Sequence, residues 1–431
     1  MSNRKLPWSI LLLVMLFIIS GCAVPAAPAP AAESMDDAAA SATPSAAAAD
    51  APAADSATSD ESAADAIKIG FVSTLSGPAA ALGVDVRDGF LLAIQHLEAD
   101  GAIAPGSMAV IVRDDQQAPD VANQAVQELL QNEQVDFMTG IIFSNIMLAV
   151  ADTIFDAETF YISPNAGPSQ LAGEGCNPFF FNVAWQNDNL HEAMGQYVME
   201  QGYQNVYILA PDYPAGHDAL TGFKRYYTGG LAEELYTQLG QLDFAVEMEL
   251  IRASGADAVF TFQPGGMGIN FIKQYAEAGL LDEIPLYLPG FSADQDVINA
   301  VGEATVGLFN SSQWTLDLEN EANARFVADF ESTYERIPTL YASQGYDAAI
   351  SIAAAVNQAG DLSDKDAVRT ALEAADFASV RGKFAYNTNH YPIQDYYLRQ
   401  VVQGDNGPIN TTVGTIFTDH ADAYAEACGM E

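Results

Sequence analysis

Short apolar runs alternate with longer amphipathic stretches along most of the chain. The apolar runs of the first half are IKIGFVSTL from residue 67, MAVIVRDD from 108, VDFMTG from 135 and TFYIS from 159. Between them, apolar residues recur at helical spacing at Val84 to Leu97, Val121 to Leu130 and in IMLAVADTIFDA. This alternation predicts strands and helices in turn, as in a parallel sheet with helices on both faces.

The same alternation begins again near residue 206. VYILAPD precedes a helix from about His217, DAVFTFQPGG precedes INFIKQYAEAGL, and IPLYLPG precedes Asp294 to Val301. Further helices are expected at about Asn320 to Arg336, Tyr341 to Gln358 and Lys365 to Ala374, and YYLRQVVQG alternates like part of an antiparallel strand pair. Because 431 residues suffice for two cores, the pattern predicts an α/β protein with two βαβ lobes in series.

The loops that follow the predicted strands are rich in small and turn residues. They read STLSGPAAALG, TGIIFSN, SPNAGPS, QPGGMG and LPGFS. Glycine and asparagine let backbone N–H groups face a crevice, and helix N-termini there favour an anionic group. In open α/β sheets ligands bind beyond the carboxyl ends of the strands, so these loops predict a ligand cleft. The alternative is that they are ordinary short connections, which favour the same residues.

The first 22 residues have the pattern of a targeting segment. Arg4 and Lys5 precede the apolar run SILLLVMLFIIS, and Gly21 and Cys22 follow it. The end of this segment, IISGC, resembles the bacterial lipoprotein signal, which implies lipidation of Cys22 and a location outside the cytoplasm, anchored to a membrane by lipid. A signal peptide with an incidental cysteine is the alternative. Residues 23 to 66 contain almost only Ala, Pro, Ser, Thr and acids, which predicts a disordered linker.

Charge and cysteine content narrow the possible partners. The chain has 16 Lys and Arg against 57 Asp and Glu, a formal net charge of −41, which disfavours nucleic-acid binding. Cys176 and Cys428 are the other cysteines, and in an oxidising compartment they most simply form one disulfide.

The sequence shows no catalytic or metal-binding pattern. Its five histidines lack a His or Cys partner at metal-ligand spacing, and no G-x-S-x-G, Walker A or H-E-x-x-H motif occurs. Asp114 and Asp115 could act as acid and base, but we expect them to cap a helix and to bond local main chain. An enzyme is therefore not expected, and neither a cofactor nor a metal is implied.

Several blocks together resemble one family. IKIGFVSTLSGPAAALGVDVRDGFLLAIQ, VIVRDDQQAPDVANQAVQELL, YISPNAGPSQL and YASQGYDAAISIAAAV are similar to the substrate-binding proteins of ABC importers, in the branched-chain amino-acid-binding family. The resemblance covers about residues 67 to 431. It implies two Rossmann-like three-layer lobes joined by a three-crossing hinge, with residues 67–185 plus 315–390 in lobe 1 and 186–314 plus 391–431 in lobe 2. It also implies a monomer that binds a small molecule and docks on a permease with a cytoplasmic ATPase.

The family's ligand contacts can be matched to this chain by position. The helix-opening serine falls on Ser144, or on Asn145 if the register shifts, and the Ala and Thr of the family's turn fall on Ala166 and Gly167, next to Asn165. The acid that pairs with the ligand ammonium falls near Gly290. The hydroxyl is missing at Gly167, and a neighbouring aromatic of the family falls near Pro264. The loss of the acid and of this aromatic disfavours an ordinary α-amino acid, since an unpaired buried ammonium costs several kcal/mol.

Aromatic residues complete the expected site. We expect Trp185, Tyr213, Phe181 and Phe291 to face the crevice, although packing within a lobe is an equal alternative for Phe179 to Phe181. Gln263 could add a polar contact, next to Pro264 and Gly265. The predicted ligand is a small carboxylate-bearing molecule, an aromatic acid or an amino acid, captured by clamshell closure. A branched-chain or neutral amino acid is the alternative ligand, and a ligand sensor for a receptor kinase is the alternative role.

Overall fold

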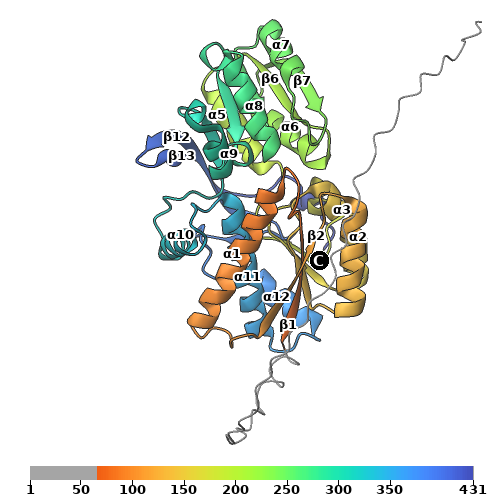
Figure 1. The fold of residues 1–431 in the computed structure, drawn as a ribbon. Coiled ribbons are helices and arrows are strands. Elements are labelled where there is room, and N and C mark those ends of the chain that lie inside the picture. The colour runs from red at the N-terminus through yellow and green to blue at the C-terminus, as the bar shows by residue number, and fades with distance from the viewer. Residues whose placement is uncertain (1–65, 431) are drawn as a thin grey trace, which may run out of the picture. The chain divides into compact units, whose positions relative to one another are not determined.

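Two parallel sheets form the centres of two lobes in the computed structural model, which describes residues 66–430 (Figure 1). The sheet of lobe 1 has five parallel strands in the order β2-β1-β3-β4-β5. The strands are β1 (Ile67–Ser73), β2 (Met108–Asp114), β3 (Phe137–Thr139), β4 (Phe160–Ser163) and β5 (Phe180–Asn182). The first four are the apolar runs that predicted them, and the predicted α/β fold class is confirmed.

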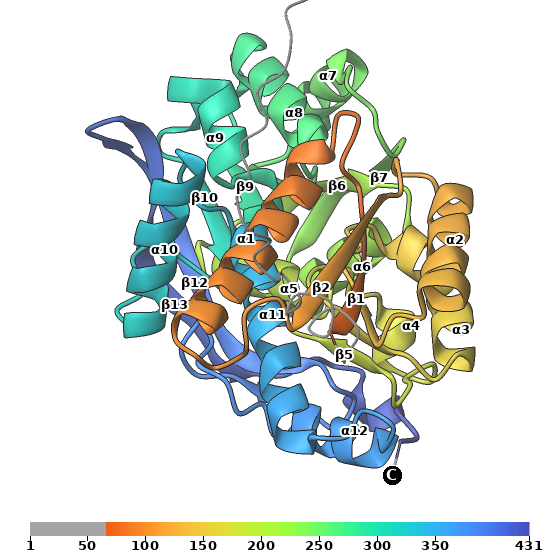
Figure 2. The same ribbon diagram turned by 60° about the horizontal axis from the view of Figure 1, so that its bottom comes forward.

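Helices cover both faces of the lobe 1 sheet. α1 (Ala80–Ala99) and α11 (Leu340–Ala359) lie side by side on one face, and α2 (Pro119–Glu128) and α3 (Ser144–Asp156) lie on the other (Figure 2). A β-carbon at Gly89 would lie 1.9 Å from the carbonyl oxygen of Ala342, and one at Gly345 would lie 1.9 Å from that of Val86. Glycine at both positions therefore permits the close approach of α1 and α11. The lobe also contains α4 (Ser169–Ala172), α10 (Glu321–Tyr334), α12 (Lys365–Glu373) and a π-helical turn (Leu129–Glu133).

The sheet of lobe 2 repeats this design. Its parallel part has the order β10-β9-β8-β6-β7, from β6 (Asn205–Pro211), β7 (Gly230–Thr237), β8 (Ala258–Thr261), β9 (Leu286–Pro289) and β10 (Phe309–Ser312). Its helices are α5 (Asn189–Glu200), α6 (Pro214–Tyr226), α7 (Ala245–Ser254), α8 (Gly266–Glu277) and α9 (Gln295–Val301). Short 3-10 turns occupy Leu280–Asp282, Gly290–Ser292, Gly302–Thr305 and Ala425–Ala427.

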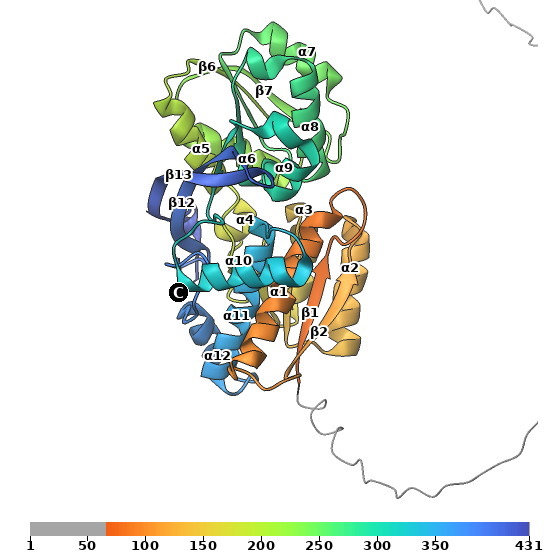
Figure 3. The same ribbon diagram turned by 60° about the vertical axis from the view of Figure 1, so that its left-hand side comes forward.

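An antiparallel extension completes the lobe 2 sheet. β12 (Pro392–Gly404) pairs with β13 (Gly407–His420), and the two strands lie side by side (Figure 3). β12 also pairs with β10 and with the short β11 (Ala385–Tyr386). The predicted antiparallel pair is therefore present. Within residues 66–430 no helix combines the length and the apolar composition that a membrane span needs. The expected signal segment, residues 1–22, and the expected linker up to residue 65 lie outside the described residues.

The two neighbouring acids at the end of β2 bond local main chain, as predicted. Asp114 accepts the N–H groups of Leu75 and Gln116, both at 2.9 Å. Asp115 accepts the N–H of Gln117 at 2.8 Å and the hydroxyl of Thr74 at 2.7 Å. The expected helix cap is wrong, because α2 begins after Ala118 and, within the described residues, has no side-chain cap.

Phe181 does not face the crevice, so that prediction is wrong. It lies in β5, is fully buried, and stacks on His390 with ring centroids 3.9 Å apart. Phe179 packs against Phe160 at 5.0 Å. The alternative, that Phe179 to Phe181 are lobe packing, is confirmed.

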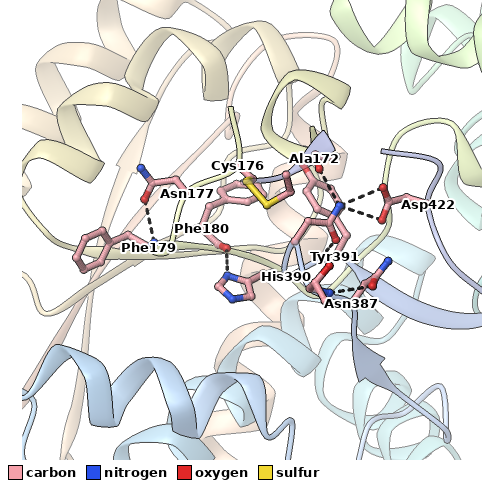
Figure 4. Close-up of a disulfide and its surroundings, with 12 residues drawn as sticks. Ala172, Cys176, Asn177, Phe179, Phe180, Asn387, His390, Tyr391 and Asp422 are labelled. Atoms are coloured by element: carbon pink, nitrogen blue, oxygen red, sulfur yellow. Dashed lines mark hydrogen bonds between the residues drawn. A yellow bond between two sulfur atoms is a disulfide. The ribbon is translucent and has the colours of Figure 1, made fainter. Parts of the chain in front are cut away.

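The predicted disulfide between Cys176 and Cys428 is present (Figure 4). It joins the segment before β5 to the segment after β13, across a sequence separation of 252. Hydrogen bonds surround it: the Asn389 side chain donates to the carbonyl of Ala172 at 2.8 Å and to Asp422 at 3.1 Å, and His390 Nδ1 donates to the carbonyl of Phe180 at 3.0 Å. The bond thus lies in an ordered, polar corner of lobe 1.

The double variant Cys176→Ser, Cys428→Ser should unfold at a lower temperature than the wild type. A cross-link over so long a loop stabilises by up to about 5 kcal/mol in the chain-entropy description. Thermal unfolding followed by circular dichroism measures the change. Dithiothreitol should lower the midpoint of the wild type and leave that of the variant unchanged; an equal effect on both would contradict the prediction.

Candidate functional site

A narrow cavity lies between the two lobes, where the strands of both sheets end. Its free volume is small, about 20 Å³. Lobe 1 contributes the segment after β3, the turn after β4, and residues of α1 and α11, and lobe 2 contributes the turns after β6, β8 and β9 and residues at the start of α5. The lining residues are Leu82, Ile142, Phe143, Ser144, Asn165, Trp185, Asn187, His191, Tyr213, Ala215, Phe262, Pro264, Phe291 and Tyr341. This is where open α/β sheets bind ligands.

Aromatic rings form most of the wall. Trp185 meets Phe291 edge to face with centroids 4.4 Å apart, and Phe262 meets Phe291 at 5.4 Å. Tyr213 stacks on Phe262 at 6.3 Å and lies 6.2 Å from Phe143. Such walls favour a flat, apolar ring, since aromatic pairs gain from offset and edge-to-face contact.

Hydrogen-bond donors gather where lobe 1 meets the cavity. α3 begins at Ser144, and within the described residues no side chain caps it. The first N–H groups of a helix have no acceptor within the helix, and they favour negative charge. Ser144 Oγ accepts a hydrogen bond from Asn187 Nδ2 at 3.1 Å, so its own O–H remains able to donate. This end of the cavity can hold a carboxylate.

Charged groups are absent from the cavity wall. Of the residues from 66 to 430, those that line the cavity include no Asp, Glu, Lys or Arg. Near Gly290, where an acid was expected in the family's pattern, a β-carbon would lie 2.9 Å from Leu340 Cδ2 and 3.0 Å from Arg399 Nη2. The environment of Gly290 therefore has little room for a longer side chain.

Part of the predicted site is brought together. Ser144, Asn165, Trp185, Tyr213, Pro264 and Phe291 all line the cavity. Asn165 donates from Nδ2 to the carbonyl of Ile142 at 2.6 Å, and its Oδ1 is buried without a partner within residues 66–430.

The other candidates lie just outside the wall. Asn145 follows Ser144 on α3. Ala166 is buried, and its carbonyl accepts from Ser163 at 2.7 Å. Gly167 donates its N–H to Asn187 Oδ1 at 3.2 Å, and a β-carbon there would lie 2.3 Å from the carbonyl oxygen of Trp185, which explains why no threonine fits.

Two lobe 2 candidates also lie apart from the cavity. Gln263 bonds Ser292 through its N–H at 2.7 Å and Thr237 through its side chain at 3.3 Å. Gly265 lines a neighbouring cavity at the start of α1. Cys22 is outside the described residues.

Sequence reasoning missed several lining residues, among them Asn187, His191, Phe262 and Tyr341. Asn187 and His191 are four residues apart at the start of α5, directly after Trp185, and His191 Nδ1 lies 2.7 Å from the Asn187 carbonyl oxygen. Two polar residues at this spacing, directly after the aromatic residue Trp185, could have indicated further ligand contacts. A lone histidine, however, is usually a polar residue whose hydrogen bonds are made within the protein.

Two buried carboxylates connect the lobes. Asp218 of α6 accepts the backbone N–H of Ser169 at 3.0 Å and its hydroxyl at 2.7 Å. Asp294, before α9, accepts the N–H of Leu340 at the start of α11 at 2.6 Å. Burial raises the pKa of both carboxyls, that of Asp294 to about 6. These bonds exist only while the lobes lie together.

Comparison with known proteins gives consistent results. A family profile described as periplasmic binding protein matches residues 66–407. The Leu/Ile/Val-binding protein homolog 6 of Brucella melitensis is 26% identical over 353 residues, which cover 80% of this chain and 90% of that protein.

Solved structures share the fold over most of the chain. A solute-binding protein of an ABC transporter from R. palustris, in complex with benzoate, is 30% identical with a TM-score of 0.79, covering 84% of this chain and 99% of that chain. Another from R. palustris, in complex with 4-hydroxybenzoate, is 25% identical with a TM-score of 0.78, covering 83% and 99%. The leucine-binding protein of Thermotoga maritima, at 19% identity and a TM-score of 0.72 over 81% and 98%, shows the fold alone. As its sequence predicts, the chain belongs to the periplasmic binding protein family, in the branched-chain amino-acid-binding group of ABC-transporter substrate-binding proteins.

Proposed function

We propose that this protein captures a small aromatic carboxylate outside the cytoplasm and delivers it to an ABC permease. The observation that carries the proposal is the cavity between the lobes, with aromatic walls, hydrogen-bond donors at the lobe 1 end, and no charged side chain among the described residues that line it. The ring packs against the aromatic wall that Trp185, Phe262 and Phe291 form together. The carboxylate lies at the start of α3, where the helix N–H groups and the Ser144 hydroxyl donate to it.

A branched-chain or neutral amino acid is the second candidate. The Leu/Ile/Val-binding name of the Brucella relative favours it. Its ammonium group would enter a cavity whose wall, within residues 66–430, contains no carboxylate, and a buried unpaired charge costs several kcal/mol. The benzoate complex of the R. palustris protein supports the aromatic acid instead.

The capture mechanism is clamshell closure of two lobes. Residues 67–185 with 315–390 form one lobe and residues 186–314 with 391–431 the other, joined by three crossings. A ligand in the cavity contacts both lobes only when they close, so it shifts the population toward the closed form. The bonds of Asp218 to Ser169 and of Asp294 to Leu340 add to the stability of that form.

Delivery requires partners beyond this chain. Lipid on Cys22 and the spacer of residues 23–66 hold the protein near its membrane, where the closed form docks on a permease powered by a cytoplasmic ATPase. A receptor kinase that binds the closed form is the alternative partner. Permease and ATPase genes next to this one would favour import.

Ser144→Ala should weaken benzoate binding by about tenfold, because a hydrogen bond to a charged group is lost. Titration calorimetry measures the dissociation constant, and Ser332→Ala, on the exposed face of α10, is the matched control. Wild-type protein that binds leucine and not benzoate would contradict the proposed ligand class. Unchanged benzoate affinity in Ser144→Ala would contradict the position of the carboxylate.

Ser169→Ala should weaken benzoate binding by about fivefold, although Ser169 does not line the cavity. Its hydroxyl bonds Asp218 across the lobes, so its loss lowers the closed population, and the apparent affinity falls with that population. Stopped-flow fluorescence of the tryptophans should show faster ligand dissociation, again with Ser332→Ala as control. An unchanged dissociation rate would contradict closure through this contact.

Cys22→Ala should release the protein from the membrane fraction, because the acyl chains that would anchor it are attached to this cysteine. Fractionation of cells that express the full chain, with metabolic palmitate labelling, measures the effect. Ala23→Ser, which changes only the next residue, should keep both the label and the membrane association. A labelled Cys22→Ala protein would contradict lipidation at this residue.

A further inference from the structure

The ring of His191 lines the ligand cavity, and one of its nitrogen atoms has no hydrogen-bond partner within residues 66–430. The residue lies on α5 and lines the cavity from the lobe 2 side, and its side chain is 1% exposed. Its Nδ1 lies 2.7 Å from the carbonyl oxygen of Asn187. A carbonyl oxygen only accepts, so Nδ1 carries the proton of this bond.

The ring is neutral, and its Nε2 atom therefore has a free lone pair. Burial lowers the pKa of His191 to about 3, and the bond to Asn187 and the charge of Glu192 oppose this only in part. Glu192 itself bonds His420 at 2.6 Å and Asn189 at 3.0 Å and pairs with Arg225. At neutral pH the ring thus presents an acceptor and no second donor.

Nothing in the described part of the chain donates to this acceptor. Nε2 of His191 is buried without a hydrogen-bond partner among residues 66–430. The His191 ring is surrounded by the rings of Phe260, Phe262 and Phe291, at centroid-to-centroid distances of 5.9, 5.1 and 5.7 Å, and phenylalanine has no donor. A buried acceptor left unpaired is costly, so a ligand group that donates to it gains affinity.

We infer that the ligand ring carries a hydroxyl group, which donates its hydrogen to Nε2 of His191 while the carboxylate lies at Ser144. The inference rests on the proposed function and narrows its ligand to hydroxy-substituted aromatic acids. Asn187 links the two positions, because its side chain donates to Ser144 Oγ at 3.1 Å and its carbonyl accepts from His191 Nδ1. Asn187 thus orients two groups from opposite lobes, namely Ser144, which binds the carboxylate, and His191, which accepts from the hydroxyl.

A branched-chain amino acid offers Nε2 a different donor. The side chains of leucine, isoleucine and valine have none, so only the ammonium group could donate to Nε2, and a neutral nitrogen does not offset the cost of burying that charge. Benzoate leaves the acceptor unpaired. His191 is therefore a specificity-determining residue, and a ring hydroxyl is the feature that it selects.

Titration calorimetry of the wild type with benzoate, 3-hydroxybenzoate, 4-hydroxybenzoate and 4-fluorobenzoate tests the inference. At least one hydroxybenzoate should bind about tenfold more tightly than both benzoate and 4-fluorobenzoate, since only the hydroxyl donates. Equal affinity for all four would overturn the inference and leave the proposed function intact. Binding of leucine with none of the four would overturn the proposed function itself.

Two variants of His191 separate the effect of its acceptor atom on ligand affinity from the effect of its ring shape. His191→Phe should bind benzoate and the hydroxybenzoates equally, and His191→Gln, which keeps an acceptor oxygen, should retain a preference for the hydroxyl. If His191→Phe does not fold, the affinities of the wild type and of His191→Gln for the four benzoates still test whether a ring hydroxyl is preferred. A preference that survives in folded His191→Phe would overturn the role of His191.

Proton uptake on ligand binding distinguishes a neutral His191, which accepts a hydrogen bond, from a protonated His191. Titrations in buffers of different ionisation enthalpy should show no proton uptake when the preferred hydroxybenzoate binds at neutral pH. Uptake of one proton in the wild type, absent in His191→Gln, would mean that His191 becomes charged and holds the carboxylate, which would overturn the inference.

Discussion

Parallel pairing of the strands constrains everything else in this molecule. Strands that run in the same direction need a crossover, here mostly helical, between each pair, so the carboxyl ends of all of them lie at the same edge of the sheet. In lobe 1 that edge carries the start of α3 and the turn after β4, and in lobe 2 it carries the turns after β6, β8 and β9. Two such edges facing each other bring residues from distant parts of the sequence to one cavity without any local motif.

The proposed ligand is an anion, although the protein is strongly acidic. A formal charge of −41 repels an acidic ligand at long range. At short range the wall, as far as the structure describes it, has no charged side chain, and the start of α3 and the hydroxyl of Ser144 lie at the end of the cavity proposed for the carboxylate. Within an aromatic, low-dielectric enclosure the dipoles of both groups act more strongly than in water, because little solvent screens them.

Particular residues show what the sequence could predict. Alternation and turn chemistry located most of the strands, and with them the cavity loops, so Trp185, Tyr213 and Phe291 were found. Neither the family match that selected Gly167 nor the loop position that selected Gln263 tells which residues line the cavity, and both lie behind the wall. β7 was missed because its residues are largely exposed and polar, and β5 was missed because three residues are too few to show alternation. His191 could not be proposed as a ligand residue from the sequence, because the proposal depends on a single unpaired ring nitrogen, which only the fold reveals.

The disulfide has a mechanical consequence for closure. The chain leaves the lobe 2 sheet after β13, yet Cys428 is bonded to Cys176 in the segment before β5 of lobe 1. The bond therefore fixes the chain that leaves β13 to lobe 1, and that chain becomes a fourth connection between the lobes. Reduction of this bond would leave the segment after β13 attached to lobe 1 by non-covalent contacts alone, such as the hydrogen bond of Asn389 to Asp422.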